Sequence, residues 1–156
     1  MKNQKSENDL SKVLKTMDKV YSSGDVSWFD YLTDDVVVYS QNSAEPYHGK
    51  KSYQKYFQPA LTASKRKLKI ISRDIRSVGE NSIVSQTVQV IQDNVVVNIK
   101  QSQVWTMTSK GWKINHFHSA FAGNPHPTDS LSRGLRSISV INEKIATIAS
   151  VVGVAQ

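Results

Sequence analysis

The stretch VWTMTSKGWKINHFHSAFA, residues 104–122, decides the fold. Its first five residues are β-branched, aromatic or otherwise apolar, which are types that suit a strand. Residues 109–111 form a short turn, in which Gly111 can adopt a positive φ. The returning half alternates with period two, so we predict a β-hairpin. Strict alternation places four large side chains on one face: Trp112, Ile114, His116 and His118.

Three helices are predicted ahead of the main run of strands. Asp9 or Ser11 can cap a first helix that ends near Ser22, where a Ser-Gly-Asp sequence stops it. Its apolar side chains recur every three or four residues and form one stripe: Leu10, Val13, Leu14, Met17, Val20 and Tyr21. A short second helix is expected over residues 28–32 and a third over residues 51–61.

Strands are predicted on both sides of the third helix, and from its end to residue 122 the chain is predicted to be β. The first, residues 36–40, precedes the third helix, and three more follow at residues 68–78, 82–91 and 95–108. The alternation slips at residues 70–71, which indicates a β-bulge. With the opening hairpin, these strands form an antiparallel meander.

Helices followed by a meander define an α+β protein, which we expect to be cone-shaped, with a curved antiparallel sheet wrapped around the N-terminal helices. Beyond the sheet, apolar residues recur every three or four positions and predict a C-terminal amphipathic helix that packs on a sheet or a partner: Leu131, Leu135, Ile138, Ile141, Ile145, Ile148 and Val152. We expect a frayed N-terminus at residues 1–8, one domain at 9–122 and a helical extension at 123–156.

Composition excludes several classes of protein. The 156 residues contain no cysteine, which excludes a disulfide scaffold, a Cys nucleophile and a thiolate metal site. Without a secretory h-region or a long apolar run, we expect a cytoplasmic protein with no membrane partner. The net charge is +7, and the segment from Lys50 to Arg76 contains nine basic residues and a single acidic residue, Asp74. That segment lacks a nucleic-acid motif, so we favour a solvated face over an anion-binding surface and expect no nucleic-acid partner.

Four short motifs occur in a distinctive order: SGDV at residues 23–26, LTDDVVV at 32–38, YHGKKSY at 47–53 and GWKINHFHS at 111–119. In this order they resemble the nuclear transport factor 2-like superfamily, whose fold is cystatin-like. The closing strand is most similar to the SnoaL-like group and to the association domain of calcium/calmodulin-dependent protein kinase II. The resemblance implies an oligomerising domain with a deep pocket.

The resemblance also assigns residues to that pocket. Ketosteroid isomerases of this fold use a Tyr and an Asp where this chain has Met17 and Ser40, and neither can replace them, so that activity is disfavoured. Arginines that line the association domain's pocket correspond to neutral residues here, which disfavours binding of a carboxylate in that manner. We predict that six residues line the ligand pocket: Met17, Gln86, Gln103, Trp105, Asn115 and Ser119.

His116, His118 and Tyr39 are the candidate catalytic residues, as a general base, its orienting partner and a hydrogen-bond donor. The same histidines could instead be structural residues that bond across strands. No third metal ligand with sensible spacing is visible, so we expect neither a metal nor a cofactor. We predict a SnoaL-like domain that binds a small ligand and forms at least a dimer. The alternative is a cofactor-free isomerase, cyclase or hydratase that acts on a small apolar substrate.

Overall fold

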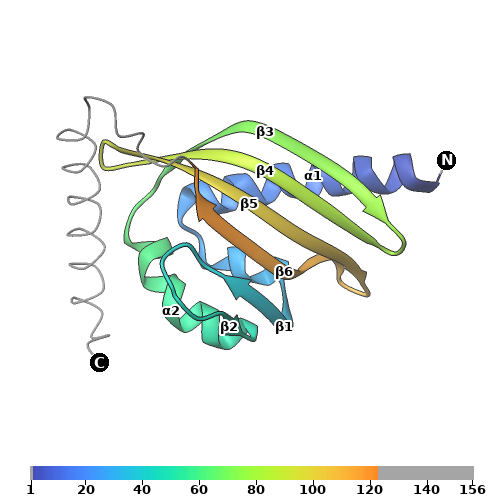
Figure 1. The fold of residues 1–156 in the computed structure, drawn as a ribbon, viewed down its shortest axis with the longest axis horizontal. Helices are drawn as coiled ribbons and strands as arrows, with labels where there is room; N and C mark the ends of the chain where they lie inside the picture. Colours follow the sequence, from blue (N-terminus) through green and yellow to red (C-terminus); the bar gives the residue numbers. More distant parts are fainter. Residues whose placement is uncertain (1, 123–156) are drawn as a thin grey trace. The chain divides into compact units, whose positions relative to one another are not determined.

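The computed structural model describes residues 2–122. The helices in this part are α1 Lys2–Ser23, the 3-10 helix η1 Val26–Tyr31, and α2 Lys50–Ala63. The strands are β1 Leu32–Tyr39, β2 Tyr47–His48, β3 Lys67–Val78, β4 Asn81–Gln92, β5 Val95–Thr108 and β6 Gly111–Phe121. Figure 1 shows α1 crossing behind the long strands of one sheet. The predicted α+β class and its curved sheet are therefore confirmed.

Helix α1 packs on the sheet through the predicted apolar stripe. Leu10, Leu14 and Met17 fall three or four residues apart and are between 0% and 4% exposed. Together they join the main hydrophobic cluster of the sheet. Burial of this stripe, rather than helix propensity alone, is what holds a helix of this length in place.

The helix begins at Lys2, so the predicted start at residues 9–11 is wrong. Contact with β3 explains the longer helix. The Glu7 carboxylate accepts hydrogen bonds from the backbone N–H and the hydroxyl of Ser77, at 3.2 and 3.0 Å. A tertiary anchor of this kind stabilises a helix end that has no local capping signal.

Gly24 terminates α1 in a left-handed conformation, with a φ of +71°. A Cβ at this position would lie 2.8 Å from the backbone oxygen of Leu61, at the end of α2. Two constraints therefore require glycine here: the backbone conformation and the close approach of the next helix.

Gly24→Ala is expected to lower the free energy of unfolding by about 2 kcal/mol, since the left-handed backbone and the contact with Leu61 both oppose a side chain. Gly111→Ala is the matched control. Gly111 also has a positive φ, +93°, but a Cβ there would meet nothing within 4 Å, so only the backbone cost of about 1 kcal/mol applies. Urea unfolding of both variants measures the difference, and equal losses would contradict the role of the close approach.

The six strands are ordered β2-β1-β6-β5-β4-β3. Strands β3 to β6 pair antiparallel in sequence order, so the predicted meander is confirmed. Two features were not predicted. Strand β1 pairs parallel with β6, with Val38 opposite Phe117, and the loop before α2 contributes the short strand β2.

Two irregularities in the antiparallel pairing decide which side chains share a face. The first lies in β3 between Ile70 and Ser72, where the sequence predicts a bulge, and it is confirmed. The second separates Val104, which pairs with His116, from Trp105, which pairs with Ile114.

This second irregularity overturns the predicted grouping in the closing strand, because Asn115 is an extra residue between two pairs. Trp112 and Ile114 point into the core and are 7% and 0% exposed. His116 and His118 point to the opposite face of the sheet, where they are half-buried and exposed respectively. The four side chains therefore do not share a face.

The remaining helices differ from the predictions mainly at their ends. Asp25 caps η1, because the backbone N–H of Ser27 donates to its carboxylate at 2.8 Å, and this bond lowers the pKa of Asp25. Helix α2 runs one or two residues further than predicted at each end. The predicted C-terminal helix lies outside the described residues.

Candidate functional site

The sheet has two faces with different surroundings. We call the face that packs on α1 the inner face and the opposite one the outer face. Inner-face residues Val84, Trp105 and Phe117 belong to the same hydrophobic cluster as Leu14 of α1. A second, smaller inner-face cluster contains Val88, Val90 and Ile99.

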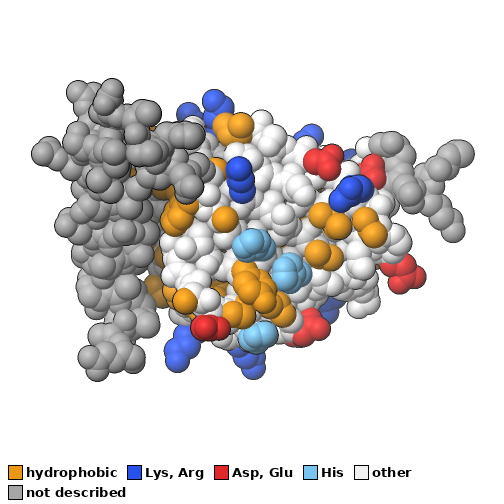
Figure 2. Space-filling model, viewed as in Figure 1, with side chains coloured by type: hydrophobic (Ala, Val, Ile, Leu, Met, Phe, Trp, Pro, Cys, Tyr) orange, Lys and Arg blue, Asp and Glu red, His pale blue; other side chains and the backbone are white. Residues whose placement is uncertain are grey.

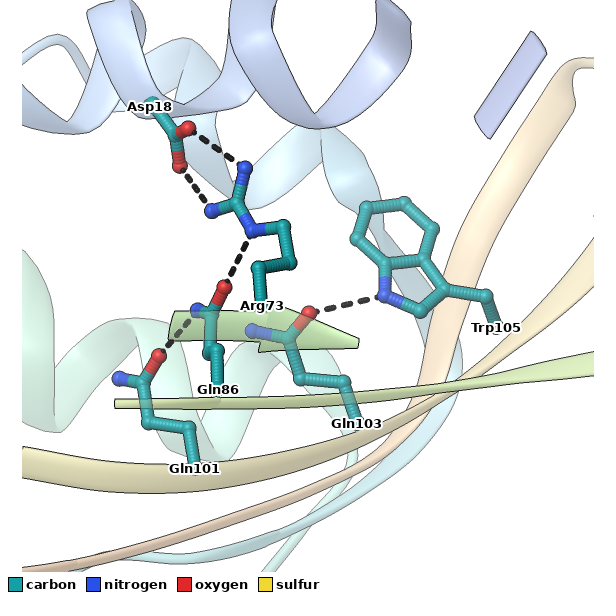
Figure 3. Close-up of polar contacts among 6 residues, drawn as sticks. All are labelled: Asp18, Arg73, Gln86, Gln101, Gln103 and Trp105. Atoms are coloured by element: carbon teal, nitrogen blue, oxygen red, sulfur yellow. Dashed lines mark hydrogen bonds and ion pairs between the residues drawn. The ribbon is translucent and has the colours of Figure 1, made fainter. Parts of the chain in front are cut away.

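A row of polar side chains crosses the inner face between these two clusters (Figure 3). The register places Arg73 of β3 opposite Gln86 of β4, Gln86 opposite Gln101 of β5, and Gln101 opposite Ser119 of β6. The Arg73 Nε donates to the Gln86 Oε1 at 2.6 Å, and the Gln86 Nε2 donates to the Gln101 Oε1 at 2.6 Å. At the far end of the row, the Ser119 hydroxyl donates to the Gln41 side-chain oxygen.

Helix α1 contributes the charge that balances this row. Both terminal nitrogens of the Arg73 guanidinium donate to the Asp18 carboxylate, each at 2.9 Å. The Arg73 and Asp18 side chains are only 14% and 19% exposed. This two-pronged pair is shielded from solvent and ties the helix to β3.

A second polar pair lies deeper on the inner face. The Trp105 indole Nε1 donates to the Gln103 Oε1 at 2.8 Å, and the two residues are 0% and 2% exposed (Figure 3). Beside them, the Ser82 hydroxyl is fully buried and has no hydrogen-bond partner among the described residues. The inner face thus combines neutral amides with a hydrophobic wall.

Five of the six predicted pocket residues lie together on the inner side of the domain. Those five are Met17, Gln86, Gln103, Trp105 and Ser119, all buried. Asn115 is not grouped with them, because it is the extra, half-buried residue at the β6 irregularity and has no partner in β5. Their role in binding a ligand stays a prediction.

The sequence-based prediction missed Arg73, the single arginine of the polar row. It expected a wholly neutral pocket, whereas β3 supplies a guanidinium to the same face as Gln86. Arg73 is two residues from Ile75 and therefore shares its face of the strand. The sequence alone does not show that this face also carries Gln86, because that depends on the pairing of β3 with β4. Asp18 neutralises this cation, so the inner face still offers no net positive charge in the row.

The candidate catalytic residues lie on the other side of the sheet. The ring of Tyr39 is 5.7 Å from that of His116 and 5.9 Å from that of His118, measured between centroids. These three rings therefore form one group on the outer face. The two histidines lie beside Tyr39 but not beside Gln103, which faces α1, and a catalytic role for the three stays a prediction.

Three of the basic residues between Lys50 and Arg76 have structural partners. Lys50 pairs with Asp34 at 3.1 Å and thereby lowers the pKa of that carboxyl, and Arg73 pairs with Asp18. Arg66, 7% exposed, donates to backbone oxygens at the end of α2. The remaining cations are divided among α2, the loop after it and the edge strand β3, which supports the solvated-surface interpretation.

The part of the chain that the structure describes contains neither a cluster of metal ligands nor a membrane-spanning helix. No three His, Asp or Glu side chains within residues 2–122 come close enough to hold a metal ion. None of the helices in this part of the chain is long and apolar enough to cross a membrane.

The fold is that of the nuclear transport factor 2-like, or cystatin-like, proteins. An NTF2-like protein from Pseudomonas putida superimposes with a TM-score of 0.70 at 10% identity, covering 79% of this chain and 91% of its own. A cystatin-like protein from Caulobacter vibrioides gives 0.62 at 11% identity, covering 83% and 99%. The CaMKII hub of S. rosetta gives 0.61 at 20% identity, covering 74% and 96%. At these identities the likeness shows the fold alone.

The family is shown by the sequence itself. Residues 6–123 match the model of the calcium/calmodulin dependent protein kinase II association domain. This chain therefore belongs to that association-domain family, as its closing strand led us to expect. None of the curated proteins matches the sequence.

Proposed function

We propose that this chain is a self-associating domain that pairs with a second copy through the outer face of its sheet. Two facts support the proposal: the chain belongs to an association-domain family, and its outer face carries apolar and aromatic side chains that no described helix covers. The second fact is our reason for assigning the contact to the outer face.

Four strands contribute to the apolar part of the outer face. We define the association patch as Val37, Tyr39, Ile83, Val104 and His116. The register joins it into a continuous row, with Val37 opposite His116, His116 opposite Val104, and Val104 opposite Ile83. Figure 2 shows hydrophobic and histidine side chains gathered over the middle of this face.

The chemistry of the patch suits contact between identical surfaces. Tyr39 is 45% exposed although it is a large aromatic residue, and aromatic residues are enriched in the buried centres of protein interfaces. A two-fold axis through the patch would set each apolar row against its copy. Charged side chains lie at its margin, such as Arg76 beside Ile83 in the neighbouring strand.

Light scattering is expected to give a mass of at least two chains for the unmodified protein and of one chain for Tyr39→Asp and Val104→Asp. An unpaired carboxylate buried at the centre of an interface is expected to prevent association. Val26→Asp is the matched control, because Val26 is 44% exposed but lies in η1, away from the patch. Circular dichroism checks that each variant is folded.

Two outcomes would contradict the proposal. A single-chain mass for the unmodified protein would exclude self-association. Association that survives both patch substitutions, or that is lost equally in the Val26 control, would assign the contact to another surface.

The enzyme alternative needs a histidine nitrogen and hydrogen-bond donors in one cavity. His116 and His118 face away from Gln103 and the other buried amides, so these groups do not converge. For a small ligand on the inner face, the neutral amides favour an uncharged polar molecule over a carboxylate. Self-association is the function that the geometry supports best.

A further inference from the structure

The outer face contains a depression beside the association patch. It has a volume of about 560 Å³ and lies over β3 to β6. The register arranges its outward side chains in two parallel rows, one along Asp74, Ser85, Ser102 and His118, the other along Ser72, Thr87, Lys100 and Ala120. No established or proposed role of the chain uses this depression.

The depression exists because small side chains stand next to large ones. Ser85 and Ser102, which are opposite each other on neighbouring strands, form the floor. Lys100 and His118 rise beside them from β5 and β6, and Asp74 stands at the β3 side. This volume lies within the usual range for ligand sites. The outward lining is polar apart from Ala120, which favours a polar ligand over an apolar one.

The polar groups of the depression are available to a ligand. Most side-chain hydrogen bonds and ion pairs of β3, β4 and β5 among residues 2–122 use inner-face side chains such as Arg73 and Gln86. On the outer face, Gln89 donates to Asn98 at 3.2 Å, and neither of these residues lines the depression. Among the described residues, the side chains of the two outward rows make no hydrogen bond and no ion pair. They combine four hydroxyls, an ammonium, an imidazole and a carboxylate.

We propose that this depression binds a small anionic polyol, of the class of sugar acids and sugar phosphates. Lys100 supplies the positive charge for the anionic group. The Ser and Thr hydroxyls, which donate and accept, match the hydroxyls of the ligand, and Asp74 accepts from one of them. The site shares none of the five residues of the association patch, but Ser102 and His118 lie two residues from Val104 and His116 along β5 and β6, so a second copy seated on the patch would stand over the depression. The titration that tests this proposal therefore also uses Tyr39→Asp, the variant expected to be a single chain, so that ligand binding is tested whether or not the chain associates.

The test is a titration of the isotope-labelled full chain, followed by backbone amide shifts in NMR spectra. The probes are D-gluconate and D-glucose 6-phosphate, with the uncharged polyol D-sorbitol for comparison. We expect saturable shifts in β4 and β5 around Ser85 and Ser102 with both anionic probes. Sorbitol is expected to bind about tenfold more weakly, since it lacks the group that pairs with Lys100.

Three variants separate charge recognition from hydroxyl recognition. Lys100→Gln is expected to weaken the binding of both anionic probes about tenfold and to leave the binding of sorbitol unchanged, because only the charge is lost. Combining Ser85→Val with Ser102→Val fills the floor of the depression and is expected to abolish binding of all three probes. Lys69→Gln is the matched control: Lys69 is an exposed lysine of β3 outside the depression, and binding should not change.

Binding of the anionic probes that is equal in Lys100→Gln, Lys69→Gln and the unmodified chain would overturn the proposal. So would the absence of saturable shifts, or shifts confined to the inner face. Light scattering on the same samples reports the oligomeric state separately, so failure of this proposal and failure of self-association can be told apart.

Discussion

Replacing Asp18 by Ala is expected to lower the free energy of unfolding by about 3 kcal/mol, because it leaves the Arg73 guanidinium without its carboxylate in a shielded position. Both nitrogens that now donate to Asp18 at 2.9 Å would lose their acceptor. Arg73 also orders Gln86, so the loss is expected to loosen the first two strands of the polar row. Urea unfolding at neutral pH measures the change.

Asp9→Ala is the matched control for that experiment. Asp9 also lies in α1, but it is 52% exposed and pairs with Lys12 only at 3.9 Å, so the expected change is below about 0.5 kcal/mol. Removing both partners, with Asp18→Leu and Arg73→Leu together, is expected to cost less than Asp18→Ala alone, since no buried charge is left unpaired. A small loss in Asp18→Ala, similar to that in Asp9→Ala, would contradict the structural role of the pair.

The order of elements was readable from the sequence because it depends on local signals. The strand at residues 95–108 was predicted with the bounds that the structure gives, and the hairpin turn at Gly111 was also correct. Turn residues and alternation act over a few positions, so one chain carries that information. Strand β2 was not predicted, because two residues are too few to show alternation.

The faces of the closing strand could not be read in the same way. Alternation assigns a face only while the register is unbroken, and the extra residue Asn115 reverses the assignment beyond it. Arg73 illustrates a second limit, since its partner Asp18 is 55 residues away in the chain. Both features depend on pairing with another segment, which a single sequence does not specify.

Trp105→Ala is the second substitution for which a large effect is expected, with a loss of about 3–5 kcal/mol in the free energy of unfolding. Trp105 is 0% exposed, belongs to the main hydrophobic cluster and donates a hydrogen bond to the Gln103 side-chain oxygen. Met107→Ala is the matched control, because Met107 lies in the same strand but is 54% exposed, so that little should change.

Two milder variants separate the cavity from the lost hydrogen bond. Trp105→Phe keeps most of the ring volume but leaves the Gln103 Oε1 buried without a donor, which costs about 1–3 kcal/mol. Adding Gln103→Leu removes the unpaired amide, and we expect it to recover part of that loss. If instead Trp105→Ala unfolds at nearly the same urea concentration as the unmodified chain, Trp105 is not part of the core. Its predicted place in the wall of a ligand pocket would then be the better account.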